Sequence, residues 1–274
     1  MMYKKKNDLE WNIKTHNKIA KKYEKIHGEI YNEVEQKRLR NQLSFAISNV
    51  QTDGDEKLVL DFGCGSGNLT HHLSSLGYNV LASDISQGFL DLVASKSDIR
   101  KVKTIQLNGF DLSNISDNSV DMVATYSVLH HVPDYLAILK EFMRVLKTGG
   151  VVFIDHESSD GFWKKDPVYI AFHDEMKTNT TRDLSKYFLV KNYYDWLVRR
   201  FINPKYHREG DIHVFEDDHI EWANVVNELM ENGGSLVYEE DYLLYRRNYD
   251  SAIYAKYVNR TSDMHILVMR KQSI

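Results

Sequence analysis

The sequence predicts a doubly wound α/β fold with a mostly parallel, seven-stranded sheet. Apolar runs alternate with amphipathic helical patterns from residue 57 to residue 157, and this order is typical of right-handed βαβ crossovers. The glycine-rich stretch DFGCGSGNL follows the first apolar run directly, at residues 61–69. A strand, a glycine turn and a helix in this order commonly bind a nucleotide-like ligand at the edge of an open sheet.

The expected elements follow from hydrophobic periodicity. Strands are expected at residues 57–62, 78–84, 101–107, 119–126 and 151–157, and two closing strands at 235–246 and 264–271. Helices are expected at residues 68–77, 86–97 and 134–147, where apolar residues recur on one face. Two further helical patterns, broken around Gly28, precede the first strand.

We expect a single domain over residues 1–274. Its parts are an N-terminal helical cap (1–55), a ligand-binding core (56–155), a largely helical insertion between strands five and six (156–235), and the last two strands (236–274). The insertion is rich in tryptophan and tyrosine and is expected to cover the ligand site.

The composition limits the possible partners and the compartment. The net charge of −4 gives no electrostatic reason to expect a nucleic-acid partner. Cys64 is the only cysteine, which excludes a disulfide framework and fits a reducing cytoplasm. No apolar stretch approaches the roughly 18 residues of a membrane helix. We therefore expect a cytoplasmic protein that binds neither nucleic acid nor membrane.

The glycine spacing argues against a dinucleotide site. The dinucleotide pattern G-x-G-x-x-G, started at Gly63, requires glycine at position 68, where the chain has Asn68. Asp61 also stands just before the turn, and its carboxylate would repel a pyrophosphate but attract an ammonium group.

Several motifs together resemble the class I, Rossmann-like methyltransferases. They are LDFGCGSGNLT, SDIS, DNSVDMVATYSVLHHVPD and VLKTGGVVFI, the last with Thr148 where the family usually has proline. The resemblance covers residues 57–155 well, the N-terminal helices loosely and the block after residue 156 hardly at all. It implies S-adenosylmethionine as the cofactor and S-adenosylhomocysteine as the product.

The resemblance also implies how the cofactor would bind at the first two strands. Its methionine part would lie against the turn that contains Gly63, Cys64, Gly65 and Gly67. Asp61 would bind the ammonium group directly or through water, and Cys64 would simply be a small residue of the turn. Asp84 would accept hydrogen bonds from both ribose hydroxyls, with Ile85 packed on the adenine. The alternative role of Asp84 is a helix N-cap.

Further cofactor contacts are expected at the ends of strands three and four. Asn108 or Asp111 would face the adenine amine. We prefer Asn108, followed by Gly109 and Phe110 against the ring, although either side chain could serve loop geometry instead.

Three more residues are expected near the sulfonium end of the cofactor. Tyr126 and Ser127 would lie beside it, and Tyr23 would fold over the cofactor. Both tyrosines could instead be core residues.

Methyl transfer from a sulfonium needs a positioned acceptor and, for a hydroxyl acceptor, a base. The candidates for the catalytic role are His130, Tyr126 and His156. Glu157 has a claim similar to that of His156, and His131 has a weaker one. No metal site is predicted, because His207, His213 and His219 lack the spacing of a helical metal site. A metal-assisted acceptor site with the nearby Asp211, Asp217 and Asp218 is the alternative to the preferred solvated loop.

The sequence therefore predicts an S-adenosylmethionine-dependent methyltransferase that acts on a small-molecule acceptor, with oxygen preferred over nitrogen or carbon. The alternative is a non-catalytic module or partner subunit on the same fold. The large insertion could also support a homodimer.

Overall fold

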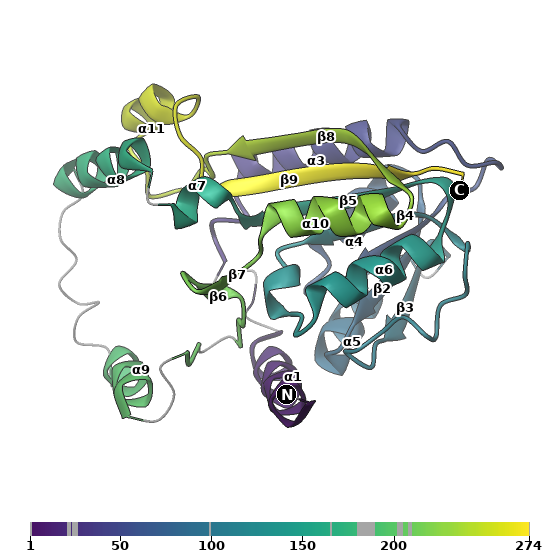
Figure 1. Ribbon diagram of the computed structural model, residues 1–274, viewed down its shortest axis with the longest axis horizontal. Coiled ribbons are helices and arrows are strands. Elements are labelled where there is room, and N and C mark those ends of the chain that lie inside the picture. Colours follow the sequence, from purple (N-terminus) through teal and green to yellow (C-terminus); the bar gives the residue numbers. More distant parts are fainter. Residues whose placement is uncertain are drawn as a thin grey trace.

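A seven-stranded sheet forms the centre of the molecule in the computed structural model (Figure 1). The structure describes residues 2–273 apart from residues 21–22, 24–26, 99, 165, 180–189, 202–204 and 208–209. The strand order is β3-β2-β1-β4-β5-β9-β8. The strands are β1 (Leu58–Phe62), β2 (Asn79–Asp84), β3 (Val102–Gln106), β4 (Val120–Tyr126), β5 (Leu146–Ser158), β8 (Gly234–Tyr242) and β9 (Met264–Lys271).

The first five strands are parallel, and only β9 runs against its neighbours β5 and β8. This arrangement confirms the predicted fold class. The chain leaves β1 toward β2 on one side, whereas β4 pairs with β1 on the other. The strand order therefore reverses between β1 and β4, and a crevice at the carboxyl ends of these strands is where open α/β sheets bind ligands.

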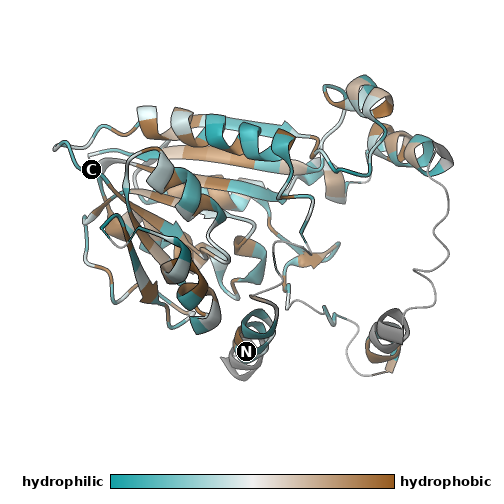
Figure 2. Cartoon of the chain, turned by 180° about the vertical axis from the view of Figure 1, so that it is seen from behind, coloured by the Kyte–Doolittle hydropathy of each residue, from teal (hydrophilic) through white to brown (hydrophobic). Residues whose placement is uncertain are grey.

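Helices cover both faces of the sheet. On one face lie α6 (Tyr135–Val145) and α10 (Trp222–Glu231), and on the other lie α3 (Glu33–Ser48), α4 (Asn68–Ser75) and α5 (Gln87–Lys96). The N-terminal helix α1 (Met2–Ile19) packs on α5. Figure 2 shows hydrophobic residues concentrated in the central strands, as expected for a sheet buried on both faces. No helix of the described residues combines the length and hydropathy needed to cross a membrane.

The predicted insertion lies between β5 and β8 and contains several elements besides α10. It contains the helices α7 (Asp160–Trp163), α8 (Pro167–Asn179) and α9 (Val190–Phe201), and a small hairpin of β6 (Val214–Phe215) and β7 (Asp218–His219). The helix α11 (Ser251–Tyr257), between β8 and β9, was not expected. It packs on α8 around Phe172, which is fully buried. The division of the chain into the four parts given above stays a prediction.

A buried polar network ties α3 to the sheet. The Arg38 guanidinium on α3 donates to Glu35 on the same helix and, at 2.8 Å, to Asp155 on β5. Tyr242 at the end of β8 donates to Asp155 at 2.9 Å, and Tyr126 at the end of β4 donates to Glu35 at 2.9 Å. The network therefore joins α3 to the ends of three strands.

Candidate active site

The turn after β1 requires glycine. Gly63 has φ 72°, and a Cβ atom there would lie 2.5 Å from Val128 Cγ1. Gly65 has φ 50°, and no atom would lie within 4 Å of its Cβ. The left-handed backbone conformation explains why both positions are glycine, since residues with a side chain rarely adopt it. The open space beside Gly65 leaves room for a ligand to approach the backbone.

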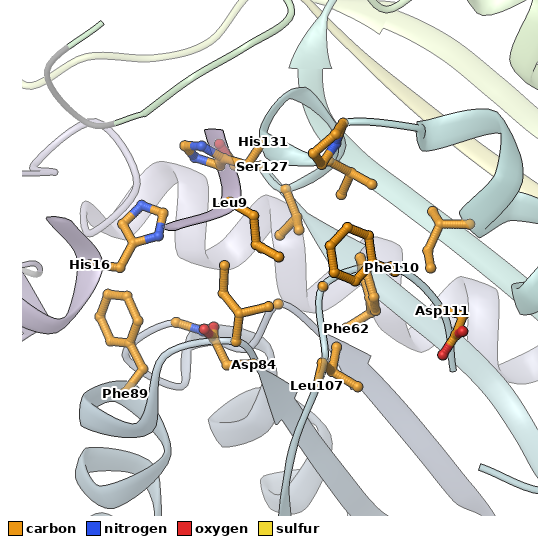
Figure 3. Close-up of a pocket in the computed structure, with 18 of the residues that line it drawn as sticks. Leu9, His16, Phe62, Asp84, Phe89, Leu107, Phe110, Asp111, Ser127 and His131 are labelled. Carbon is orange, nitrogen blue, oxygen red and sulfur yellow. The ribbon is translucent and has the colours of Figure 1, made fainter. Parts of the chain in front are cut away.

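A cavity opens beside this turn, and we call it the glycine-turn cavity (Figure 3). Its lining includes the following residues: Leu9, His16, Tyr23, Phe62, Gly63, Gly65, Asp84, Ile85, Phe89, Leu107, Gly109, Phe110, Asp111, Ser127, Val128 and His131. The lining thus brings together Tyr23, Gly63, Gly65, Asp84, Ile85, Gly109, Phe110 and Ser127 of the predicted cofactor residues. Leu9 and His16 on α1 were not anticipated.

Asp84 is bonded to the turn and also lines the glycine-turn cavity. Its Oδ2 accepts a hydrogen bond from Gly65 N at 3.0 Å, and its Oδ1 accepts one from Ser86 N at 2.7 Å. The N-cap of α5 is Ser86. Asp84 is therefore not the N-cap of α5, which was its alternative role. Each carboxylate oxygen can accept a further bond from a ligand hydroxyl.

Asp61 is buried beneath the turn. Its Oδ2 accepts a hydrogen bond from the Thr70 hydroxyl. Its Oδ1 is buried and has no hydrogen-bond partner among the described residues. A buried acceptor that lacks a partner is costly, and an ammonium group or a water bridging to one would satisfy it. This buried acceptor thus fits an amino-acid ligand with a positive charge.

Five predicted cofactor residues do not line the glycine-turn cavity: Asp61, Cys64, Gly67, Asn108 and Tyr126. The Asn108 side chain accepts hydrogen bonds from Phe110 N and Asp111 N at 2.7 and 3.0 Å, which is loop chemistry, while Asp111 lines the cavity. The Asp111 carboxylate likewise accepts hydrogen bonds within the loop, from Asn108 Nδ2 at 2.7 Å and from Ser113 N at 3.0 Å. Cys64 is buried, and Gly67 precedes α4 as its N-cap.

Tyr126 contacts Glu35 on α3 and His156 on β5. Its hydroxyl donates to Glu35, and its ring stacks on His156 with centroids 4.6 Å apart. Tyr126 lines neither cavity, so its position supports a structural role rather than the catalytic one predicted for it. Ser127, the next residue, has φ 59° and lines both.

A second cavity shares Ser127 with the first, and we call it the histidine cavity. It has a volume of about 170 Å³. Its lining residues are Ser127, His130, His156, Glu157, Ser158, Trp163, His213, Val214, Ile220 and Met264. Two of the predicted catalytic residues, His130 and His156, therefore meet here. Trp163, His213 and Ile220 come from the insertion, whose aromatic residues were expected to cover the ligand site; His213 and Ile220 were not expected there.

A buried carboxylate fixes the His130 ring. His130 Nδ1 lies 2.7 Å from Glu157 Oε2. Glu157 is 2% exposed, and its Oε1 accepts hydrogen bonds from Val128 N and Leu129 N at 2.8 and 2.7 Å. A carboxylate on Nδ1 sets the tautomer and orientation of an imidazole. The Nε2 atom of His130 is thus the one that can act on a ligand.

His156 is strained and buried. Its φ is 64°, a conformation that is uncommon outside glycine, and such strain is often found at functional sites. Both ring nitrogens are buried and have no hydrogen-bond partner among the described residues. Burial lowers the pKa of His156, so its ring is neutral at pH 7. A ligand in the histidine cavity could supply the missing partners.

His131 belongs to the glycine-turn cavity rather than the histidine cavity. Its ring lies edge-on to His16, with centroids 4.9 Å apart. Burial, together with neighbouring His130, lowers the pKa of His131 well below the usual range. Its Nδ1 lies 3.5 Å from Asp211 Oδ1, although Asp211 is distant in sequence.

Comparison with known proteins agrees with this geometry. A family model described as "Methyltransferase domain" matches residues 60–154. A demethylmenaquinone methyltransferase of Staphylococcus epidermidis is 34% identical over 139 residues, which are 49% of this chain and 55% of the relative. A ubiquinone biosynthesis O-methyltransferase of Hydrogenovibrio crunogenus is 31% identical over 101 residues, which are 36% and 42% of the two chains. This chain thus spans about half the length of the relatives that it matches.

Solved structures show the same fold. An S-adenosylmethionine-dependent methyltransferase from Mesorhizobium loti has a TM-score of 0.55 at 18% identity, and the match covers 84% of this chain and 96% of that one. The order of the seven strands, the glycine turn at their switch point and the family match agree with one another. Residues 60–154 therefore match a methyltransferase domain, and the chain has the fold of a solved S-adenosylmethionine-dependent methyltransferase.

Proposed function

We propose that this chain transfers a methyl group from S-adenosylmethionine to a hydroxyl oxygen of a small molecule bound in the histidine cavity. The observation that carries this proposal is that Ser127 lines both cavities. A ligand of the glycine-turn cavity and one of the histidine cavity would therefore meet at this residue. Methyl transfer is an in-line displacement that needs such a juxtaposition.

The glycine-turn cavity and the turn beside it have the groups that the cofactor requires. Asp84 would accept from the ribose hydroxyls, Asp61 would bind the ammonium group, and the open backbone at Gly65 would face the methionine part. When bound, the cofactor supplies a methyl group activated by a positive sulfur. Tyr23 on the N-terminal side would limit the access of water.

The histidine cavity suits an oxygen acceptor. A hydroxyl must lose its proton when it is methylated, whereas a neutral amine needs no base beforehand. The His130 ring is oriented by Glu157, and the ring nitrogens of His156 have no hydrogen-bond partner among the described residues, so both imidazoles are candidates to bind a hydroxyl. Cavities of about 150 Å³ bind benzene, so a volume of about 170 Å³ accepts one ring-sized group.

Cofactor binding is expected to depend on pH through the two buried aspartates. Burial raises the pKa of Asp61 to about 7 and that of Asp84 to about 6, from 3.8. Because both pKa values are higher in the folded chain than in the unfolded chain, protonation of the two aspartates favours the unliganded fold. This contribution to stability is lost as the pH rises through about 6 to 7. The ionised forms are those that bind an ammonium group and hydroxyls, so the ligand binds better at the higher pH.

We expect the affinity for S-adenosylhomocysteine to rise roughly tenfold or more between about pH 5 and about pH 8. Calorimetric titration across this range measures it. Asp61→Asn, which cannot ionise, should give a flatter pH profile than the wild type. An affinity that falls toward high pH would contradict these roles of Asp61 and Asp84.

A matched pair of acceptors tests the oxygen assignment. Methyl-labelled S-adenosylmethionine is incubated with single-ring phenols and with the anilines of the same ring pattern, and the products are identified by mass spectrometry. We expect labelled methyl ethers from the phenols and at least about 100-fold less transfer by His130→Ala. His71→Ala, which changes an exposed histidine on α4, should match the wild type.

Two results would contradict the proposal in different ways. If only the anilines are methylated, on nitrogen, the acceptor atom is nitrogen rather than oxygen. Tight binding of S-adenosylhomocysteine without transfer to any acceptor would favour the non-catalytic module on the same fold.

A further inference from the structure

We propose that His130, His131 and Asp211 bind a divalent transition-metal ion at the boundary between the two cavities, and that this ion activates the acceptor hydroxyl. The proposal rests on the proposed function for the role of the ion, but not for its binding. It departs from the sequence prediction, which contained no metal site.

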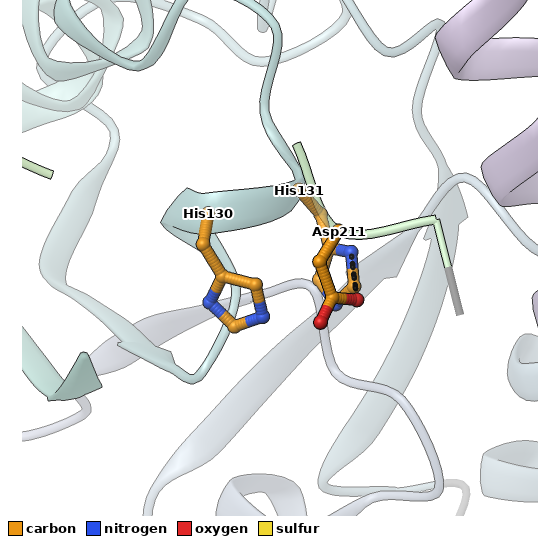
Figure 4. Close-up of side chains that lie close together, drawn as sticks. All are labelled: His130, His131 and Asp211. Atoms are coloured by element: carbon orange, nitrogen blue, oxygen red, sulfur yellow. Dashed lines mark ion pairs between the residues drawn. The ribbon is translucent and has the colours of Figure 1, made fainter. Parts of the chain in front are cut away.

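The three side chains offer the right kinds of ligand atom. One atom from each of His130, His131 and Asp211 lies within 4.8 Å of the others (Figure 4). Bonds of about 2.0–2.2 Å to a central zinc ion place ligand atoms somewhat closer than this, so small side-chain rotations would complete the site. Two imidazoles and a carboxylate suit zinc or a similar ion better than magnesium or calcium. Three protein ligands also leave a position for a substrate, as in catalytic zinc sites.

The surroundings of these residues are those of metal ligands. A metal-bound histidine usually donates its other ring N–H to a carboxylate, and His130 Nδ1 lies 2.7 Å from the buried Glu157. Ligand carboxylates are in turn held by other groups, and His207 Nδ1 lies 3.0 Å from Asp211 Oδ2. The Nε2 of His130 and the Oδ1 of Asp211 are therefore the atoms we assign to the ion.

Backbone contacts hold the two sides of the site together. Ile212 N and His213 N, which follow Asp211, donate to the carbonyl oxygen of His130 at 2.9 and 3.0 Å. The segment of Asp211 is thereby joined directly to the histidine pair. These main-chain hydrogen bonds hold the segment of Asp211 next to His130, so the position of Asp211 does not depend on its ion pairs alone.

Polar atoms at the centre of the cluster lack hydrogen bonds. His131 Nδ1 and Asp211 Oδ1 are buried, and neither has a hydrogen-bond partner among the described residues. Their separation of 3.5 Å is longer than a charge-assisted hydrogen bond but close to the spacing of two ligands on one ion. A cation between them would satisfy both atoms.

The location explains what the ion could do. His131 lines the glycine-turn cavity and His130 lines the histidine cavity, so the ion would lie beside Ser127, where the ligands of both cavities meet. A cation there lowers the pKa of a hydroxyl that binds to it. The O–H bond breaks and its proton passes to solvent. The oxygen then forms a bond to the methyl carbon as the carbon–sulfur bond breaks, which leaves S-adenosylhomocysteine.

Zinc titration of the metal-free full-length chain tests the proposal. The chain is stripped with a chelator, and Zn²⁺ binding is followed by calorimetry and by metal analysis. We expect one ion per wild-type chain. Asp211→Ala should weaken binding by about 100-fold or more, and Glu157→Gln by roughly 10- to 100-fold. Asp217→Ala changes an exposed carboxylate of the same segment and should bind zinc like the wild type.

The outcomes separate this proposal from the proposed function. Wild-type zinc affinity in Asp211→Ala, or no zinc bound by the wild type, would overturn the metal site. Full methyl transfer by the metal-free wild type would overturn the role of the ion while leaving the methyltransferase function intact, with His130 as its base. If Asp211→Ala fails to fold, as judged by lost S-adenosylhomocysteine binding, Glu157→Gln and the wild-type stoichiometry decide the question.

Discussion

Replacing Arg38 by alanine is expected to lower the free energy of unfolding by about 3–5 kcal/mol. The guanidinium lies between two buried carboxylates, Asp155 and Glu35, which are 0% and 1% exposed. Burial already raises the pKa of Asp155 even with Arg38 present. Without the cation, both carboxylates would have to be buried uncompensated or take up protons, and either alternative costs stability.

Urea unfolding of the variant measures this loss. Arg100→Ala is the matched control, because Arg100 forms an ion pair with Asp98 at 2.9 Å but is 85% exposed. Exposed pairs contribute about 1 kcal/mol or less, so this control should unfold close to the wild type. Similar losses in both variants would show that the buried network is no more important than a surface pair.

Replacing Asp84 by alanine is expected to weaken S-adenosylhomocysteine binding by about 100-fold, or roughly 3 kcal/mol. The carboxylate lines the glycine-turn cavity (Figure 3) and is positioned by Gly65 N and Ser86 N. Hydrogen bonds to a charged acceptor contribute about 1.5–3 kcal/mol each, and two ribose hydroxyls would bind here. Loss of both should account for the whole effect.

The control for this variant is Asp91→Ala, which removes an exposed carboxylate from α5. Thermal unfolding of both variants checks that the turn still folds, since Asp84 also accepts hydrogen bonds from it. A folded Asp84→Ala chain that binds the ligand within about twofold of the wild type would remove Asp84 from the cofactor site.

The strands, the glycine turn and Asp84 could be predicted because each depends on local sequence. Alternating apolar strands and amphipathic helices require a sheet covered on both faces, and the glycines require left-handed backbone. The direction of the Tyr126 side chain could not be predicted, because successive side chains of a strand alternate between the two faces of the sheet. Its side chain lies on the face of the sheet that α3 covers, where Glu35 accepts a hydrogen bond from its hydroxyl.

The remaining features depend on contacts between distant segments. Nothing local distinguishes Asp211 from a loop aspartate until the fold brings it to His131. Asn108 and Asp111 are equally polar in one loop, and only its turn geometry decides which of them lines the cavity. The helix α11 has a short pattern that gains its apolar contacts from Phe172, far away in the sequence.

The most direct test of the account is a calorimetric titration of the wild-type chain with S-adenosylhomocysteine and, separately, with NAD. The carboxylate of Asp61 and the absence of a glycine at Asn68 favour an amino-acid ligand over a pyrophosphate. We expect binding of one S-adenosylhomocysteine per chain and no measurable binding of NAD. Binding of NAD without S-adenosylhomocysteine would contradict it.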